Sequence, residues 1–305
     1  MGYSTILVDR TDGVATITLN RPQARNALDL VMRRELLTAL DELEAEPAVR
    51  VVILTGGGGH FSAGGDVKTM AAKRQTAAEG RARVESLNRF IIRLFEYPKP
   101  TIAMVDGFAV GAGCNIALGC DIVIASDRAR FGEVFAKIGL VPDGGGTWLL
   151  PRLVGLAKAK ELVFSADIID AAEALRIGLV NRVVPAAELE ATTRALAARI
   201  AAGPPGALGL AKALLNRSTT VDLGTSLGLG LRPGPEHHHR RSRRRRARLP
   251  REAPAQVYRH MNRQQDLAEC PRPGGVRGPS RIRNGCPPTG GVRGPFLGPR
   301  IWKRC

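Results

Sequence analysis

Short apolar runs separated by turn residues characterise the first third of the chain. The segments 4–9 and 14–20, STILVD and VATITLN, are rich in β-branched residues. They flank an Asp-Gly pair at 12–13, which favours a tight hairpin turn. The same kind of buried run recurs as RVVILTGG at 50–57 and TIAMVDG at 101–107. The pattern therefore predicts a sheet that begins with a β-hairpin.

Helical periodicity alternates with these strands. Apolar residues recur three or four positions apart over 27–46 and 78–100, and prolines follow or end both segments. A short apolar helix over 111–119 and a strand over 120–126 come next, and helical patterns dominate from about residue 170. Strands that alternate with helices predict an α/β fold in which helices cover parallel strands.

The last quarter of the chain has a different composition. Residues 231–305 hold 19 Lys/Arg against 4 Asp/Glu, a net charge of +15, whereas residues 1–230 hold 26 against 24 and contribute +2 of the total +17. The 231–305 segment also holds 11 Pro and 9 Gly and has little apolar periodicity, so we predict a disordered tail. We divide residues 1–230 into an α/β core at 1–200 and the start of a C-terminal helical region at 201–230. The arginine run either binds nucleic acid or another anionic surface, or has no function.

The tail can also be explained as a sequence read out of frame. Shifted by one base, codons allowed for residues 235–260 can encode QSITTADHAEGVRAFLEKRPPRFTGT. Met261 is encoded by ATG and the codon for Asn262 begins with A, so the shifted frame meets the stop codon TGA there for every codon choice. We therefore hypothesise a frameshift between about Leu227 and Pro235, and we expect no nucleic-acid partner.

Cysteine number and hydropathy indicate a cytoplasmic protein without a membrane partner. The five cysteines include no CxxC spacing, so we expect neither a disulfide framework nor a metal site, and we expect Cys114 and Cys120 to be buried. No apolar run is long enough to cross a bilayer, and the N-terminal residues lack the apolar core of a signal peptide.

Four segments in a fixed order, three of them rich in glycine, carry a family resemblance. They are LNRPQARNALD, LTGGGGHFSAGGDVKTM, KPTIAMVDGFAVGAGCNIALGCDIVIAS and FGEVFAKIGLVPDGGGTWLLPRLVG. None contains a phosphate-loop GK[ST] or a G-x-G-x-x-G spacing between strand and helix, and any one cluster alone would indicate only a turn. Together, over about residues 4–220, they resemble the crotonase superfamily of enoyl-CoA hydratases and isomerases. The resemblance implies a crotonase (ClpP-like) superhelix of ββα repeats with a C-terminal helical portion, assembled as trimers or hexamers.

The resemblance also implies an acyl-CoA substrate, no separate cofactor and an oxyanion hole. Removal of a proton next to a thioester moves negative charge onto the carbonyl oxygen, and each preorganised amide donor there is worth about 3–4 kcal/mol. By the family motifs these donors are the main-chain amides of Gly65 and Ala112. The predicted helix that starts near Ala112 adds a favourable dipole.

The same motifs suggest residues that bind coenzyme A. Arg25 is expected to contact the phosphates, Lys68 is a weaker candidate, and the carbonyl of Ala63 is expected to meet the adenine amino group. For Arg25 and Lys68 the alternative is an ordinary surface charge. Asp66 is expected to brace the loop that carries Gly65.

The two glutamates of the family's hydratases are absent. Asn115 and Phe135 occupy their positions, and neither side chain can transfer a proton as a carboxylate does. Asn115 is expected to hydrogen-bond a substrate or water. Glu133, two residues before Phe135, is predicted to lie at the surface or an interface.

Asp143, in GLVPDGGG, is the candidate acid and base. In the resemblance it stands where enoyl-CoA isomerases and ring-1,2-epoxyphenylacetyl-CoA isomerases carry their working acid. The alternative is that Asp143 caps the helix that follows. An apolar pocket containing Phe135 and Trp148 would raise its pKa. We therefore expect an enoyl-CoA isomerase, with a 2-enoyl-CoA hydratase or a non-catalytic acyl-CoA-binding protein as the alternatives.

Overall fold

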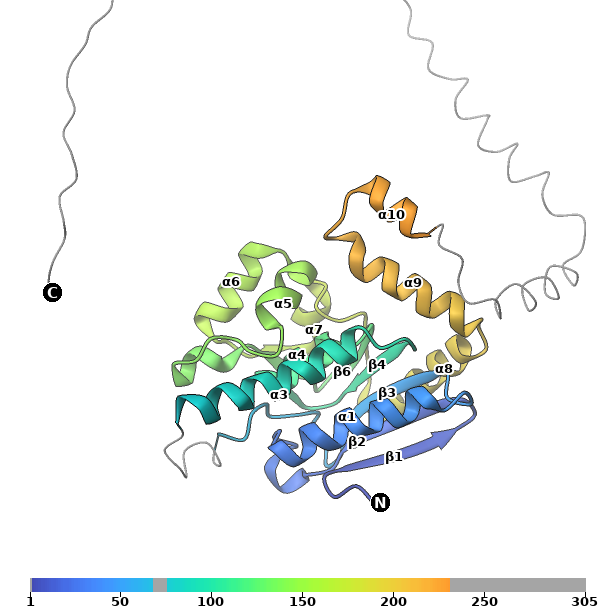
Figure 1. The fold of residues 1–305 in the computed structure, drawn as a ribbon. Helices are drawn as coiled ribbons and strands as arrows, with labels where there is room; N and C mark the ends of the chain where they lie inside the picture. The colour runs from blue at the N-terminus through green and yellow to red at the C-terminus, as the bar shows by residue number, and fades with distance from the viewer. Residues whose placement is uncertain (1, 68–75, 231–305) are drawn as a thin grey trace, which may run out of the picture. The chain divides into compact units, whose positions relative to one another are not determined.

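The computed structural model describes residues 2–67 and 76–230, all of which lie in one compact unit that holds two β-sheets (Figure 1). In the six-stranded sheet, the strands have the order β1-β2-β3-β4-β6-β9. They are β1 (Ile6–Thr11), β2 (Val14–Leu19), β3 (Val51–Gly56), β4 (Thr101–Val105), β6 (Ile122–Ser126) and β9 (Arg182–Val184). Strand β1 is antiparallel to β2, and all the following pairs are parallel.

The smaller sheet has the order β5-β7-β8. Its strands are β5 (Phe108–Val110), β7 (Arg130–Gly132) and β8 (Ile169–Asp170). Strand β7 is parallel to β5 and antiparallel to β8. These short strands were not predicted, because two or three residues are too few to give a periodic pattern.

The predicted hairpin is confirmed. Thr11 pairs with Val14, and Asp12 and Gly13 between them have φ angles of 51° and 80°. A two-residue turn of this kind needs positive φ at both positions, which Asp and Gly tolerate better than other residues.

Helices occupy most of the remaining described residues. They are α1 (Leu30–Ala45), α3 (Ala77–Phe95), α4 (Ala112–Leu118), α5 (Gly146–Val154), α6 (Leu156–Ser165), α7 (Ala171–Arg176), α8 (Leu189–Ala201), α9 (Pro205–Ser218) and α10 (Leu223–Gly230), with 3-10 turns at Pro22–Ala24, Val134–Ile138 and Ala186–Glu188. Asp29 caps α1 by accepting from the amide of Met32 at 2.8 Å. Thr76 and Glu79 form a capping box at the start of α3.

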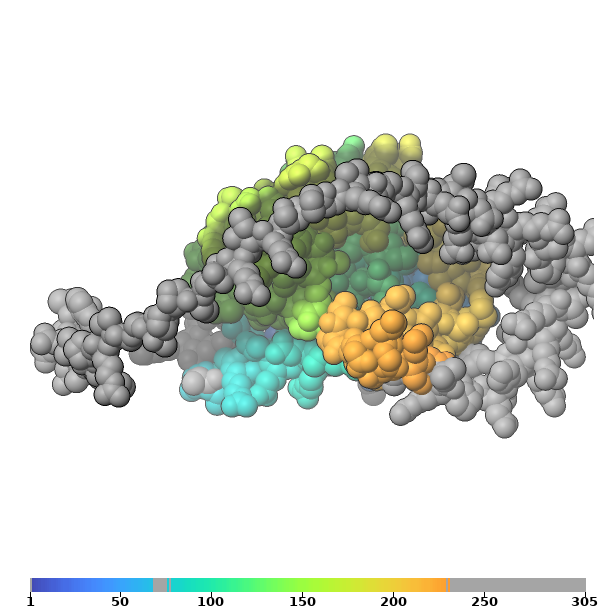
Figure 2. Space-filling view, turned by 90° about the horizontal axis from the view of Figure 1, so that it is seen from above, coloured from blue at the N-terminus to red at the C-terminus, as the bar shows by residue number. Residues whose placement is uncertain are grey.

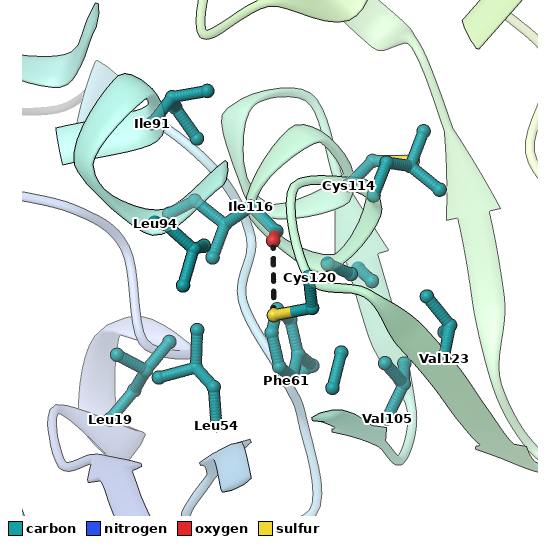
Figure 3. Close-up of a cluster of buried hydrophobic side chains, with 14 of the residues drawn as sticks. Leu19, Leu54, Phe61, Ile91, Leu94, Val105, Cys114, Ile116, Cys120 and Val123 are labelled. Carbon is teal, nitrogen blue, oxygen red and sulfur yellow. Dashed lines mark hydrogen bonds between the residues drawn. The ribbon is translucent and has the colours of Figure 1, made fainter. Parts of the chain in front are cut away.

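Successive side chains along the central strands of the large sheet point alternately into two hydrophobic cores, one on each face. Val51 and Ile53 pack with the α8 residues Leu189 and Ala197. Residues of the opposite parity face the larger core, which contains buried side chains of α1, α3 and α4. Figure 3 shows part of that core, in which Leu54 of β3, Leu94 of α3 and Ile116 of α4 converge. The period-two pattern of the strands therefore places helices on both faces.

Both described cysteines lie in the larger core, as predicted. Cys120 Sγ lies 3.7 Å from the carbonyl oxygen of Ile116 (Figure 3), and Cys114 is buried as well. Burial raises the pKa of the Cys120 thiol to about 12 and also raises that of Cys114. Neither thiol is available as a thiolate at neutral pH.

Two polar contacts of α9 fix the C-terminal helices to the core. Lys212 of α9 pairs with Asp121 at 2.8 Å, and Asn216 donates to the carbonyl of Phe95 at 2.9 Å. Figure 2 shows α10, in orange, at the surface, and α10 packs against α9. Among the described residues, no helix has the length and apolarity needed to span a membrane. The predicted tail at 231–305 lies outside the described residues.

Candidate active site

Two chain segments that carry the predicted amide donors lie side by side. The amide of Ser62 donates to the carbonyl of Phe108 at 2.8 Å, and the amide of Val110 donates back to Ser62 at 3.0 Å. These bonds align the loop after Phe61 with β5, which leads directly into α4. The structure therefore brings the neighbourhoods of Gly65 and Ala112 together.

Gly64 permits this close approach. Its φ is +87°, and a Cβ atom added there would lie 2.6 Å from the carbonyl oxygen of Val110 and 3.2 Å from the amide nitrogen of Ala112. Only glycine fits such a position without strain. Within the described residues, the amides of Gly65 and Ala112 donate to no acceptor. The amide of Ala112 is also the first of α4, where helix amides lack internal partners.

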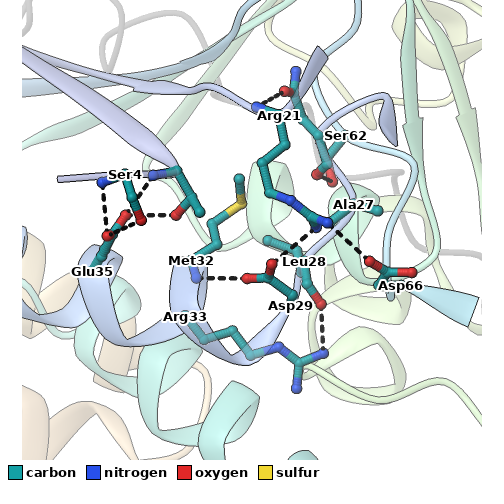
Figure 4. A network of polar contacts seen from close by, with 12 residues as sticks. Ser4, Arg21, Ala27, Leu28, Asp29, Met32, Arg33, Glu35, Ser62 and Asp66 are labelled. Carbon is teal, nitrogen blue, oxygen red and sulfur yellow. Dashed lines mark hydrogen bonds and ion pairs between the residues drawn. The ribbon is translucent and has the colours of Figure 1, made fainter. Parts of the chain in front are cut away.

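A salt-bridge network holds the Gly65 loop in place. Arg21 bridges two carboxylates, Asp66 at 3.1 Å and Asp29 at 3.3 Å (Figure 4). Because Asp29 also caps α1, the loop is tied to the first turn of that helix. Asp66 braces the loop, in agreement with the interpretation of the sequence.

The two described candidates for coenzyme A binding are neighbours. The amide of Ala63 donates to the carbonyl of Arg25 at 2.8 Å. The Arg25 side chain is exposed, and its guanidinium lies 5.7 Å from the centre of the Phe108 ring. Both residues are thus close to the Gly65 loop. Lys68 lies outside the described residues.

An apolar cavity of about 670 Å³ lies between α3 and the segment that ends in α5. Asp143 forms part of its wall, whereas Gly65 and Ala112 are not among its lining residues. The apolar lining includes Ile91, Ile92, Phe95, Val141, Trp148 and Leu149. Trp148 was predicted to stand in this pocket and does so.

Phe135 occupies a different place from the predicted one. It is buried but does not line this cavity, and its ring is 3.8 Å from where a Cβ of Gly111 would lie, at the start of α4. The 3-10 turn Val134–Ile138 directs this ring toward the first residues of α4 instead of toward α3. The apolar surroundings of Asp143 therefore come from α3 and α5.

Asp143 does not cap the following helix. Helix α5 begins at Gly146 after Gly145, and no side chain caps its first turn. The Oδ1 atom of Asp143 is buried and has no hydrogen-bond partner among the described residues. Burial raises the pKa of Asp143, and the nearby positive charges of Arg33 and Arg83 oppose this rise. A carboxyl in an apolar cavity with a raised pKa is typical of an acid or base that exchanges protons near neutral pH.

The two arginines were not predicted as part of the site. Arg33 of α1 is only 4% exposed, and it donates to the carbonyl of Arg83 of α3 at 2.8 Å. The Nε atoms of both arginines are buried without a partner among the described residues. The available signal was the charge of Arg33 within the apolar face of a predicted helix, because a buried charge is rare without a specific role.

Asn115 and Glu133 form a buried polar pair behind Asp143. Asn115 is 0% exposed, and its Nδ2 donates to the carbonyl of Asp143 at 2.8 Å and lies 3.4 Å from Glu133 Oε2. The prediction of a surface position for Glu133 is wrong: this residue is 1% exposed. The reason is that β7 runs into the interior and Glu133 follows it directly, beneath α4.

The environment of Glu133 alters its titration. Burial raises the pKa of Glu133 to about 7; hydrogen bonds from Asn115 and Cys114 lower it, and the charge of Asp143 raises it further. Its Oε1 atom has no partner among the described residues. At neutral pH this buried carboxyl is therefore neutral in a large share of molecules.

Comparison with known proteins agrees with this geometry. The sequence profile described as enoyl-CoA hydratase/isomerase matches residues 9–232. A short-chain-enoyl-CoA hydratase of Clostridium acetobutylicum is 43% identical over 228 residues, which are 74% of this chain and 87% of that protein. A crotonyl-CoA hydratase of Syntrophomonas wolfei is 39% identical over 231 residues, which are 75% of this chain and 88% of that protein.

Solved structures show the same architecture. The crystal structure of an enoyl-CoA hydratase from Bacillus anthracis matches with a TM-score of 0.72 and 37% identity, and the match covers 74% of this chain and 88% of that one. The expected α/β crotonase fold is therefore confirmed.

Proposed function

The chain belongs to the enoyl-CoA hydratase/isomerase family, and we propose that it is an enoyl-CoA isomerase in which Asp143 transfers the proton. Enzymes of this family act on coenzyme A thioesters without a separate cofactor. The observation that carries the proposal is the carboxyl group of Asp143 at the wall of an apolar cavity, because its Oδ1 atom is buried and has no hydrogen-bond partner among the described residues.

The proposed reaction moves a double bond without net gain or loss of atoms. The Asp143 carboxylate removes a proton from C2 of a 3-enoyl thioester, and the electrons delocalise onto the thioester oxygen. The amides of Gly65 and Ala112 stabilise that oxygen. The protonated Asp143 then returns the proton at C4, so that the double bond between C3 and C4 moves to C2 and C3. One carboxyl group is sufficient for both steps.

The coenzyme A portion is proposed to bind beside the Gly65 loop. Arg25 would neutralise phosphate charge, and the carbonyl of Ala63 would accept from the adenine amino group. The bond between Ala63 and Arg25 supports this proposal, because it holds the two groups close together. Lys68 remains a proposed further contact. For a chain with an intact C-terminus, the proposed assembly is a homotrimer or hexamer.

A 2-enoyl-CoA hydratase is the second candidate, because the Clostridium acetobutylicum and Syntrophomonas wolfei relatives are named hydratases. Hydration requires a water molecule to be both positioned and activated. The positions of the two family glutamates hold Asn115 and Phe135, which cannot act as bases. The isomerase proposal fits these two residues better.

Two assays on the full chain separate the candidates. We expect conversion of 3-hexenoyl-CoA to 2-hexenoyl-CoA to have a higher kcat/KM than hydration of crotonyl-CoA, both followed by the absorbance of the conjugated thioester. Faster hydration than isomerisation would reject the isomerase assignment. Binding of acyl-CoA with turnover in neither assay would indicate a non-catalytic acyl-CoA-binding protein.

A further inference from the structure

Glu133 has no role in the mechanism above, although it is the most deeply buried carboxyl group near Asp143. It contacts α4 at two side chains, Cys114 and Asn115. Burial of a carboxyl group without a cationic partner is costly unless the group is neutral or serves a purpose. Because Glu133 lies beneath α4, the helix that carries Ala112, its role is expected to involve the residues of that helix.

The Asn115 side chain connects Glu133 to Asp143. One amide group is within hydrogen-bond distance of the Glu133 carboxyl group and the main-chain carbonyl of Asp143, at 3.4 Å and 2.8 Å. A Cβ added to Gly146 would lie 2.6 Å from the same amide nitrogen, so the turn after Asp143 is packed directly against it. A displacement of the Asn115 amide would therefore displace the turn that carries Asp143.

We propose that Glu133 is a positioning residue, which in its neutral form fixes the Asn115 amide and thereby the main chain of Asp143. The proposal rests on the assigned acid-base role of Asp143 and extends it to the groups behind it. The neutral carboxyl accepts from Asn115 without adding negative charge close to the reacting thioester. The groups that face Glu133 are Cys114 and Asn115 of α4 and Asp143 of the turn, and the charges of Arg33 of α1 and Arg83 of α3 act on Asp143.

Ionisation of Glu133 would oppose the reaction. A second buried negative charge beside α4 disfavours the developing oxyanion, because charges interact strongly where water is excluded. We therefore expect kcat of the wild-type enzyme to fall as the pH rises through about 7, the value at which Glu133 titrates. A glutamine at this position keeps the shape and the acceptor but cannot ionise.

The test compares Glu133→Ala, Glu133→Gln and a control, Glu190→Gln, which changes an exposed carboxylate of α8. We expect Glu133→Ala to lower kcat about tenfold with KM changed less than about twofold, the effect of one lost hydrogen bond. Glu133→Gln should match the wild type at pH 6 and lack the decline above pH 7. Wild-type kcat in Glu133→Ala, or a decline retained in Glu133→Gln, would overturn the proposal.

An infrared titration tests the same idea without turnover. We expect a protonated-carboxyl band at pH 6 that is absent from Glu133→Gln and unchanged in Glu190→Gln. In Asp143→Asn this band should titrate at lower pH, because the Asp143 charge no longer opposes ionisation of Glu133. Absence of the band, or identical titration in Asp143→Asn, would overturn the proposal. Inactivity of the wild type toward every enoyl-CoA would reject the proposed function alone.

Discussion

The side-chain amide of Asn115 donates to the main-chain carbonyl of Asp143 at 2.8 Å. This bond links α4, whose first amide is that of Ala112, to the turn that carries the candidate acid and base. The side-chain nitrogen of the residue that stands at a family glutamate position is therefore engaged in contacts within the protein, whereas its Oδ1 atom has no hydrogen-bond partner among the described residues. The proposed proton-transfer group, Asp143, and one proposed oxyanion donor, the amide of Ala112, come from different parts of the chain, and this contact links the turn that carries the first to the helix that carries the second.

Replacement of Asp143 by asparagine should abolish proton transfer and leave the fold intact. Asparagine has nearly the same shape but cannot accept the C2 proton, so we expect kcat for 3-enoyl-CoA isomerisation to fall about a hundred- to ten-thousandfold. Steady-state kinetics with 3-hexenoyl-CoA measures the change. The control is Asp167→Asn, an exposed carboxylate outside the cavity lining. Retained turnover in Asp143→Asn would remove this residue from the mechanism.

A methyl group at Gly64 should separate the two amide donors. The added Cβ would lie 2.6 Å from the Val110 carbonyl, so the loop that carries Gly65 must move. We expect Gly64→Ala to lower kcat about a hundred- to a thousandfold, the usual effect of one lost oxyanion donor. The measurement is kcat for isomerisation, with circular dichroism to verify folding.

Gly59→Ala is the matched control for that experiment. Gly59 has a φ of +78°, close to that of Gly64, but a Cβ there meets nothing within 4 Å. The substitution adds a similar backbone strain, about 1–2 kcal/mol, without contact with the donors. We expect wild-type kcat and a modest loss of stability. Equal kinetic losses in the two variants would contradict the proposed oxyanion hole.

Glu133 should make the stability of the fold depend on pH. A carboxyl whose folded-state pKa is raised stabilises the fold fully below its unfolded pKa, and this contribution is lost as the pH rises through the folded value. For Glu133 the relevant window is about 4.5 to about 7. We expect Glu133→Gln to gain stability relative to the wild type between pH 5 and pH 8, by at most about 3 kcal/mol. Urea unfolding at both pH values measures this gain; a constant difference between the two proteins would contradict it.

Restoration of the reading frame should change the assembly state. Leu215, Leu223 and Leu227 of α9 and α10 are 69%, 76% and 63% exposed. Large apolar side chains that are this exposed are expected to contact another segment or chain when they form a continuous patch. We expect a chain whose frame is restored after about Leu227 to sediment as a trimer or hexamer, and the present chain as a smaller species. Analytical ultracentrifugation of both proteins measures this, and resequencing of the gene tests the frameshift itself.

The sequence by itself determined the elements with strong local patterns. The β1–β2 hairpin, β3, β4, α1, α3, α4 and β6 all follow from periodicity, turn residues and prolines. The ordered motifs were enough to indicate the family, since close main-chain approach at Gly64 and Gly113 leaves a mark in the sequence. These features depend on neighbours along the chain, which a sequence displays directly.

Only the tertiary structure decided which charged groups share the site. Glu133 is buried because β7 carries it beneath α4, and Arg33 reaches the surroundings of Asp143 because α1 packs against α3. Packing between the segment that holds Phe135 and the start of α4 likewise turns the Phe135 ring toward Gly111 and away from the cavity. Burial and electrostatic coupling depend on atoms brought together from distant segments, and no local pattern of polar and apolar residues encodes those distances.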